Sequence, residues 1–303
     1  INSDHSTWSP DLPKRVIIRG GGATGVEFAT IYRDFGCEVT LVGRVVPNED
    51  REVSQQLTRS FTKAGIKIIP DYRPTAEDFN ITEGGVELRV KRDGKEERIE
   101  ADTLLVAIGR QGNIEDIGLE ELGIKTKDSY IVTDDFGFTG VDGVYAIGDV
   151  IGKQLLAHTA MHQGIIVMEL LAGKKPMPLD LKKVPSVTFC HPEIGSVGLT
   201  EEEAKAEGRT IKVGKFPLRA NGKALIEDEV DGFAKVIADA ETDEILGVHL
   251  IGGHATELIG EAALASLLEA TPWEIGLSVH PHPTISEVLG EAALAVDGMA
   301  IHI

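Results

Sequence analysis

Short apolar runs alternate with glycine turns and amphipathic stretches in the first half of the chain. Apolar runs at 16–18 and 39–42 predict two strands. The residues between them predict a helix that Gly36 can cap, because apolar side chains recur at roughly helical intervals: Val26, Ala29, Ile31 and Phe35. This order is typical of an α/β domain with a parallel sheet.

Further periodic segments follow as far as residue 173. The segment 65–70 predicts a strand, and 84–109 predicts an antiparallel hairpin that turns at Asp93-Gly94, followed by an apolar strand from Leu104 to Ile108. A buried strand is predicted over 143–150. Residues 155–173 then have the length and spacing of one long helix, closed by Gly173.

The pattern changes after a proline- and lysine-rich stretch at 173–186, which we interpret as a domain boundary. Two strands paired around an acidic turn are predicted over 234–252, and an amphipathic helix over 255–270. The second half therefore has α+β character.

Composition limits the kinds of function that are open to the chain. Its 303 residues suffice for two or three domains, and 42% hydrophobic with 26% charged residues is ordinary for a soluble globular protein. A net charge of −19 argues against binding nucleic acid or an anionic membrane surface. Cys37 and Cys190 are too distant in sequence for a CxxC-like pair, which suits a reducing, cytoplasmic compartment.

The glycines after the first predicted strand have chemical meaning. Gly20, Gly22 and Gly25 follow the G-x-G-x-x-G spacing between a strand and a helix, with a second strand behind them. Glycines let the backbone approach a pyrophosphate, and the helix N-terminus offers free N–H groups. We therefore predict dinucleotide binding rather than a plain tight turn.

The residue expected to contact the ribose of the dinucleotide is unusual. An NAD-binding unit commonly carries Asp or Glu at the end of the second strand, but here Gly43 and Arg44 stand there. An arginine can accommodate a 2′-phosphate, which favours NADP over NAD. The alternative is that Arg44 is a solvated strand-end residue and that backbone groups hold the ribose.

A histidine between two prolines opens the last predicted helix, in the segment 280–294. His282 is followed by Thr284-x-x-Glu287, which has the spacing of a capping box, as does Thr200-x-x-Glu203. On spacing alone, capping is the commoner role for Glu287. His158 and His162 have the i, i+4 spacing of metal ligands, but without a third ligand we expect no metal site.

The ordered set of motifs resembles the flavin-dependent pyridine nucleotide–disulfide oxidoreductases, above all their dihydrolipoamide dehydrogenase branch. The motifs are the glycine turn, "LLVAIGRQGN", "TGVDGVYAIGDV", "LLAHTAMHQG" and "HPHPTISE". The resemblance implies an α/β Rossmann-like NAD(P) domain, a remnant of the FAD-binding domain, and a C-terminal α+β dimer-interface domain. The expected ranges are 1–13 (connector), 14–133 (NAD(P) domain), 134–183 (C-terminal part of the FAD domain) and 184–303 (dimerisation).

The resemblance also implies roles for individual residues. His282 would be the catalytic acid–base that completes the partner subunit's active site in a homodimer, with Glu287 orienting it. The residues expected to lie at NAD or NADP are Gly20, Gly22, Gly25, Glu27, Arg44, Gly109 and Arg110. Asp149 would bind the ribityl chain of FAD, and Leu156, Ala157 and His158 would lie beside the flavin ring.

The chain also departs from the family pattern. It contains neither a second GxGxxG for the FAD adenylate nor a CxxxxC redox pair. We therefore expect it to correspond to the C-terminal two-thirds of such an enzyme, to hold only half of an FAD site, and to be inactive alone with a dithiol such as dihydrolipoamide. Two alternatives stay open: an NADPH-dependent enzyme of the glutathione- or mercuric-reductase type, and a non-catalytic NAD(P)-binding dimer.

Overall fold

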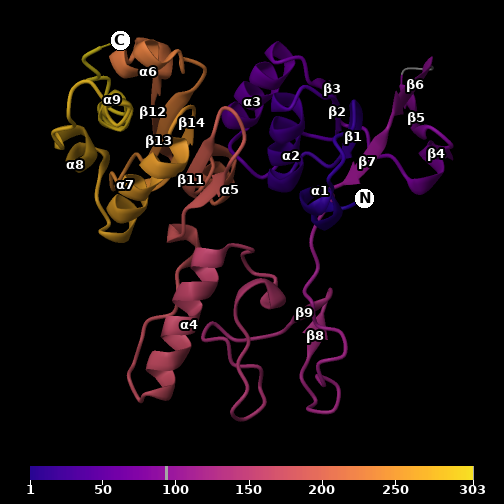
Figure 1. Ribbon diagram of the computed structural model, residues 1–303. Coiled ribbons are helices and arrows are strands. Elements are labelled where there is room, and N and C mark those ends of the chain that lie inside the picture. Colours follow the sequence, from indigo (N-terminus) through magenta and orange to yellow (C-terminus); the bar gives the residue numbers. More distant parts are fainter. Residues whose placement is uncertain (93–94, 303) are drawn as a thin grey trace. The chain divides into compact units, whose positions relative to one another are not determined.

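The computed structural model describes residues 1–92 and 95–302, so the turn predicted at Asp93-Gly94 lies outside the described residues. The chain forms two compact units (Figure 1). The larger unit combines Ile1–Ile108 with Val187–Ile303, and the smaller one is Gly109–Ser186. Each unit is described by itself below.

A parallel sheet forms the centre of the N-terminal part of the larger unit. Its strands lie in the order β3 (Lys67–Ile69), β2 (Glu38–Val42), β1 (Arg15–Arg19) and β7 (Thr103–Val106). Ile17 and Ile18 are both fully buried although they point to opposite faces, so both faces of β1 are covered. The predicted strand–helix–strand order is thereby confirmed.

Different elements cover the two faces of this sheet. Helices α2 (Ala23–Asp34) and α3 (Arg51–Lys63) pack against the face that carries Ile18, and an antiparallel sheet packs against the face that carries Ile17. That second sheet consists of β4 (Phe79–Thr82), β5 (Gly85–Arg92) and β6 (Lys95–Ala101), which confirms the predicted hairpin strands. The flanking elements are α1 (Ser3–Trp8) and the 3₁₀ turn η1 (Ala76–Asp78).

The C-terminal part of the larger unit is built on a five-stranded sheet, as its predicted α+β character requires. The strand order is β10 (Ser186–Thr188), β11 (Ile194–Gly198), β14 (Ile245–Ile251), β13 (Phe233–Asp239) and β12 (Ile211–Pro217). Both strands predicted within 234–252 are present and pair antiparallel. The helices and turns of this part are α5 (Glu201–Ala206), η4 (Leu218–Ala220), α6 (Gly222–Glu227), α7 (Ala255–Leu267), α8 (Pro272–Leu277) and α9 (Glu287–Ala295).

The two faces of this sheet bury different partners. Val197, Val236 and Val248 join a core with α7 and α9. Residues one position away along the strands point to the other face, where Phe233 and Ile251 belong to the same core as α2 and α3. The N-terminal parallel sheet with its helices and the C-terminal sheet thus share one hydrophobic core.

The smaller unit has little regular structure. It contains the short pair β8 (Thr126–Lys127) and β9 (Tyr130–Ile131), the 3₁₀ turns η2 (Gly148–Ile151) and η3 (Leu181–Lys183), and the long helix α4 (Ala157–Leu171). The helix predicted over 155–173 is confirmed, and Gly173 follows it with a φ of +78°.

The strand predicted over 143–150 is wrong. Tyr145 forms a single bridge to Phe138, and Gly148 starts the 3₁₀ turn with a φ of +73°. The apolar residues are instead used in a small irregular core with β9 and η2. The strand predicted from Leu104 to Ile108 also ends early, at Val106, and Ile108 is exposed.

Candidate functional site

The glycine turn between β1 and α2 has the geometry of an anion-binding loop. A Cβ at Gly20 would overlap the carbonyl oxygen of Ala107, and a Cβ at Gly25 would overlap that of Gly20. These two glycines therefore serve close backbone packing. Gly22 differs, because a Cβ there would meet no heavy atom within 4 Å.

Gly22 is the N-cap of α2 and offers no side chain to the first N–H groups of the helix. These donors and the positive end of the helix dipole therefore remain available to an anion at this turn. The residues present thus fit a pyrophosphate at this turn.

Arg44 lies beside this turn. Its backbone carbonyl is so close to Gly21 that a Cβ there would overlap it, and Val46 donates its N–H to the Gly21 carbonyl at 2.6 Å. The guanidinium is 61% exposed, with its Nε 3.8 Å from an Asp71 oxygen. An exposed ion pair is weak, so this guanidinium is available to an anionic ligand.

Glu27, predicted to lie at the same cofactor, follows on α2. Its Oε1 accepts the N–H of Phe189 at 2.9 Å, so the carboxylate joins α2 to the segment after β10. The next hydrogen bond of this kind runs from the His191 N–H to the Thr30 hydroxyl, at 3.2 Å.

In the smaller unit, two residues predicted for different cofactors contact each other. Arg110 donates from Nη1 to Oδ2 of Asp149 at 3.5 Å, and both side chains are more than half exposed. The Tyr130 hydroxyl donates to the Arg110 carbonyl at 2.8 Å. Gly109, just before this pair, has a φ of +159°.

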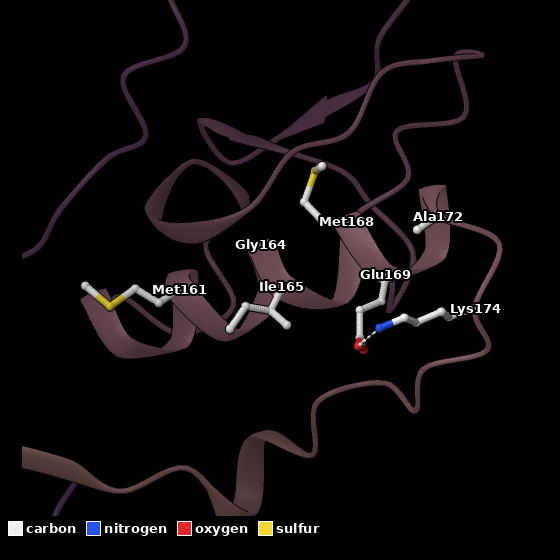
Figure 2. A pocket seen from close by; sticks show the side chains of 7 residues that line it. All are labelled: Met161, Gly164, Ile165, Met168, Glu169, Ala172 and Lys174. Atoms are coloured by element: carbon white, nitrogen blue, oxygen red, sulfur yellow. Dashed lines mark hydrogen bonds and ion pairs between the residues drawn. The ribbon is translucent and has the colours of Figure 1, made fainter.

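The other predicted flavin residues start α4. Leu156 is the N-cap residue, Ala157 is the first helical residue, and the Nε2 of His158 lies 2.8 Å from the Pro185 carbonyl oxygen. The first turn of α4 has no side-chain cap. One face of α4 lines an open groove of about 610 Å³ (Figure 2), formed by Met161, Gly164, Ile165, Met168, Glu169, Ala172 and Lys174.

The segment before α9 holds a histidine–carboxylate pair. Nδ1 of His282 lies 2.9 Å from Oε1 of Glu287, and the other carboxylate oxygen accepts the Thr284 N–H at 3.0 Å. The Thr284 hydroxyl donates to the Pro281 carbonyl and does not cap the helix. The capping box expected from the spacing is therefore not formed: α9 begins at Glu287 after the N-cap residue Ser286, and the Glu287 carboxylate instead contacts His282 and the Thr284 N–H.

This arrangement favours the ionised form of the Glu287 carboxylate. Burial raises the pKa of Glu287. The hydrogen bonds from the Thr284 N–H and from His282 together lower it by more than burial raises it, so the net pKa is below its ordinary value. The Glu287 carboxylate can only accept a hydrogen bond, so this contact favours a proton on Nδ1 of His282. The His282 side chain is 77% exposed, so Nε2 is accessible to a substrate.

A second histidine–carboxylate pair lies nearby in the chain, and it was not predicted from the sequence. Nε2 of His280 lies 2.8 Å from Oε1 of Glu261 on α7, and this histidine is 10% exposed. A hydrogen bond to Glu261 raises the pKa of His280 against the effect of burial. A Cβ at Gly290 would lie 2.9 Å from the imidazole Nδ1, so glycine at this position gives the ring its space on α9.

Both cysteines are buried and free. Burial raises the pKa of Cys37 and raises that of Cys190 far more, so neither is a thiolate near neutral pH. In the parts of the chain that the structure describes, no cluster of three or more His, Cys, Asp or Glu could hold a metal ion. The same residues include no helix that is long and apolar enough to cross a bilayer.

These features define a class of protein: an α/β fold with a glycine turn of the dinucleotide-binding type, joined through a shared core to an α+β part that carries an exposed histidine–carboxylate pair. The comparisons with known proteins narrow this class. Residues 2–164 match the family described as pyridine nucleotide-disulphide oxidoreductase, and residues 184–293 match the dimerisation domain of the same family. The chain belongs to this family, whose members depend on FAD and NAD(P).

Individual relatives agree with this assignment. The chain is 47% identical to the dihydrolipoyl dehydrogenase of Bacillus subtilis over 100% of its own length and 64% of the relative's. It is 42% identical to that of Zymomonas mobilis, over 98% of the chain and 65% of the relative. The chain therefore spans about two-thirds of the length of these curated relatives.

Solved structures are similar over the same extent. LpdA of Mycobacterium tuberculosis matches with a TM-score of 0.87 and 29% identity, over 97% of this chain and 64% of that one. The HOCl-induced flavoprotein disulfide reductase RclA of Escherichia coli matches with a TM-score of 0.89 and 27% identity, over 97% and 67%.

Proposed function

We propose that this chain is the pyridine-nucleotide and dimerisation part of a dihydrolipoyl dehydrogenase-type oxidoreductase. The observation that carries the proposal is the Glu287 carboxylate, which is divided between the Thr284 N–H and Nδ1 of His282. In the intact enzyme, a dithiol such as dihydrolipoamide would be the substrate. FAD, when bound, supplies the electron transfer between the dithiol–disulfide couple and the nicotinamide.

The protein residues have separate tasks in this proposal. His282 accepts a thiol proton at Nε2 and returns it, while ionised Glu287 holds the imidazole in the correct tautomer and stabilises the imidazolium. Gly22 and the first turn of α2 bind the pyrophosphate of the pyridine nucleotide. Arg44 lies beside the 2′ position of its ribose. In a homodimer formed by the C-terminal domain, His282 serves the active site of the partner subunit.

For FAD, this chain supplies half of a site. Asp149, with Arg110 beside it, would bind the ribityl chain, and the segment from Leu156 to His158 would lie along the flavin ring. The sequence contains no second GxGxxG for the adenylate and no CxxxxC pair. We therefore propose that the isolated chain binds flavin weakly, if at all, and does not oxidise dihydrolipoamide.

The exposed Arg44 favours a second candidate within the same family. A guanidinium at the end of β2 suits a 2′-phosphate better than a 2′-hydroxyl, as in an NADPH-dependent reductase of the glutathione or mercuric type. A non-catalytic NAD(P)-binding dimer is the remaining alternative. Titration with NADH and with NADPH separates the nucleotide preferences.

The proposal is tested in two steps. First, the visible absorption spectrum of the purified chain is recorded and dihydrolipoamide oxidation is assayed; we expect neither flavin bands nor turnover. Second, the N-terminal third of the Bacillus subtilis dihydrolipoyl dehydrogenase is fused to this chain. The fusion is expected to bind FAD and to oxidise dihydrolipoamide.

A His282→Gln variant of the fusion decides the role of the histidine. We expect its turnover to fall at least about a hundredfold, the usual contribution of a general acid–base, while NADH-dependent reduction of an artificial acceptor stays unchanged. Full dihydrolipoamide turnover in the variant, or turnover by the chain alone, would refute the proposal.

A further inference from the structure

A row of polar residues crosses the C-terminal sheet on the face that packs against α3. Ser196 on β11, His249 on β14, Lys235 on β13 and Lys215 on β12 are direct cross-strand partners, so all four side chains lie on one face. Ser196, His249 and Lys235 are 7%, 1% and 1% exposed. A buried ammonium group requires compensation by partners of opposite charge.

The side chains that contact Lys235 and Ser196 come mainly from the loop 43–50 and from the start of α3. Nζ of Lys235 lies 3.0 Å from both oxygens of Asp50, which is fully buried, and 3.0 Å from Glu52. Glu201 at the start of α5 adds a contact at 2.7 Å. The Ser196 hydroxyl donates to Glu49, one residue before Asp50.

The charged state of this cluster is well defined. Burial raises the pKa of Asp50, but the hydrogen bond to Lys235, the neighbouring positive charge and the Glu52 N–H together bring the net pKa below its ordinary value. Burial lowers the pKa of Lys235, but its three carboxylate partners outweigh that effect and raise it. Asp50 and Lys235 are therefore an ion pair across the neutral pH range, and removing either would leave a buried charge.

The other end of the same loop lies against the glycine turn. Its contacts there are the Arg44 carbonyl packed on Gly21 and the Val46 N–H bonded to the Gly21 carbonyl. Ser54 donates to the Val45 carbonyl at 2.6 Å and ties the middle of the loop to α3. The loop is thus fixed between the glycine turn and the C-terminal sheet.

We propose that Lys235 and Ser196 are positioning residues for the nucleotide site: they hold the loop 43–50 from the C-terminal sheet, and through it they fix Arg44 beside the glycine turn. This inference rests on the proposed nucleotide binding. It assigns to the C-terminal domain a part in cofactor selection, because the ribose-facing residue is placed by contacts that this domain supplies.

The test uses the full chain and two variants, Lys235→Met and the milder Ser196→Ala. The first readout is amide hydrogen exchange over residues 43–50, which reports on the loop without any nucleotide. The second is the Kd for NADPH and for NADH, followed by nicotinamide fluorescence. Lys205→Gln is the matched control, because Lys205 pairs with the same Glu201 but is 59% exposed.

We expect faster exchange of the loop in both variants and a loss of about tenfold in NADPH affinity in Lys235→Met, the effect of misplacing one charge-assisted contact. NADH affinity should change much less, so the ratio of the two Kd values changes, which a general loss of stability would not produce. Ser196→Ala should shift this ratio in the same direction, and Lys205→Gln should leave it unchanged.

Unchanged exchange over 43–50 in both folded variants would overturn the inference, whatever the nucleotide titrations give. Faster exchange with an unchanged NADPH-to-NADH ratio would also overturn it. If the parent chain bound neither nucleotide, the proposed function would fail, and the exchange readout would still decide whether the sheet holds the loop.

Discussion

Each glycine of the turn after β1 has its own physical role. Gly20 and Gly25 are required by backbone contacts within the fold, whereas the space beside Gly22 is open. The same residue type therefore serves packing at two positions and, in the function that we propose, ligand access at the third. This difference can be tested because the two roles respond differently to one added methyl group.

We predict that Gly22→Ala weakens NADPH and NADH binding at least about tenfold while changing stability by no more than about 1 kcal/mol. The added methyl meets no protein atom but would occupy the space in which we propose that the pyrophosphate binds. Gly25→Ala should instead destabilise the fold, because its Cβ would overlap the Gly20 carbonyl.

Thermal unfolding and fluorescence titration of the three proteins check this prediction. Gly260→Ala in α7 is the control, because its site is equally open and lies outside the turn. Equal nucleotide affinity in Gly22→Ala and the parent would contradict a pyrophosphate at this turn.

The Glu287 carboxylate predicts a pH-dependent contribution to stability. Its folded-state pKa is lowered, so its contribution is complete above the unfolded-state pKa of about 4.3 and is lost as the pH falls through the folded-state value. We expect Glu287→Gln to lower the unfolding temperature near neutral pH, and this difference should shrink in acid.

Thermal melts of both proteins across the acidic range measure the effect, with the exposed Glu202→Gln as the control. A difference between parent and Glu287→Gln that stays constant with pH would show that the charge of Glu287 is not what stabilises this segment.

At the scale of elements, α7 and α9 are joined through a histidine. His280 contacts Glu261 on α7 and lies in the space left by Gly290 on α9. Its pKa is raised, so its stabilising effect is complete below the unfolded-state pKa of about 6.5 and is lost as the pH rises through the folded-state value.

We therefore expect His280→Gln to be less stable than the parent at mildly acidic pH, with a smaller difference under alkaline conditions. Unfolding temperatures measured over this range test the sign. His254→Gln is the control, because its contact with Glu227 is longer and its side chain is 56% exposed. A difference that grows with rising pH would contradict the assigned direction.

Sequence periodicity predicted those elements whose partners lie close by in the chain. The strands β1 and β2, the helix between them, and the antiparallel pair β13–β14 each follow from local pattern and turn residues. The segment 143–150 was mispredicted because an apolar run cannot reveal whether a neighbouring strand is present. In its place, a 3₁₀ turn begins at Gly148.

The site was predictable only in part, for a related reason. Gly22, His282 and Glu287 stand in recognisable local spacings. Contacts between distant residues leave little local signal, and Lys235 meets Asp50 across 185 positions. One hint was present in the sequence: Lys235 interrupts the apolar run at 233–238. His280 and Glu261, on different elements, gave no such hint.

At the scale of the whole molecule, an exposed apolar surface on α4 requires explanation. Met161, Ile165 and Met168 are 68%, 56% and 65% exposed and line the groove of Figure 2. Their spacing places them along one side of the helix. Contiguous exposed apolar surface on a soluble protein favours association.

We predict that the purified chain forms concentration-dependent species larger than the dimer that we propose for the C-terminal domain. The double substitution Ile165→Glu with Met168→Glu should remove these larger species and leave the dimer, because two charges on this face cannot be buried in a contact without a large desolvation cost.

Sedimentation velocity over a range of concentrations measures both species. Ile81→Glu is the control, since Ile81 is 78% exposed on β4, which belongs to the larger unit. If the α4 variant associates as strongly as the parent, the groove is not the contact surface; if it becomes monomeric, α4 belongs to the dimer interface and the C-terminal domain does not dimerise alone.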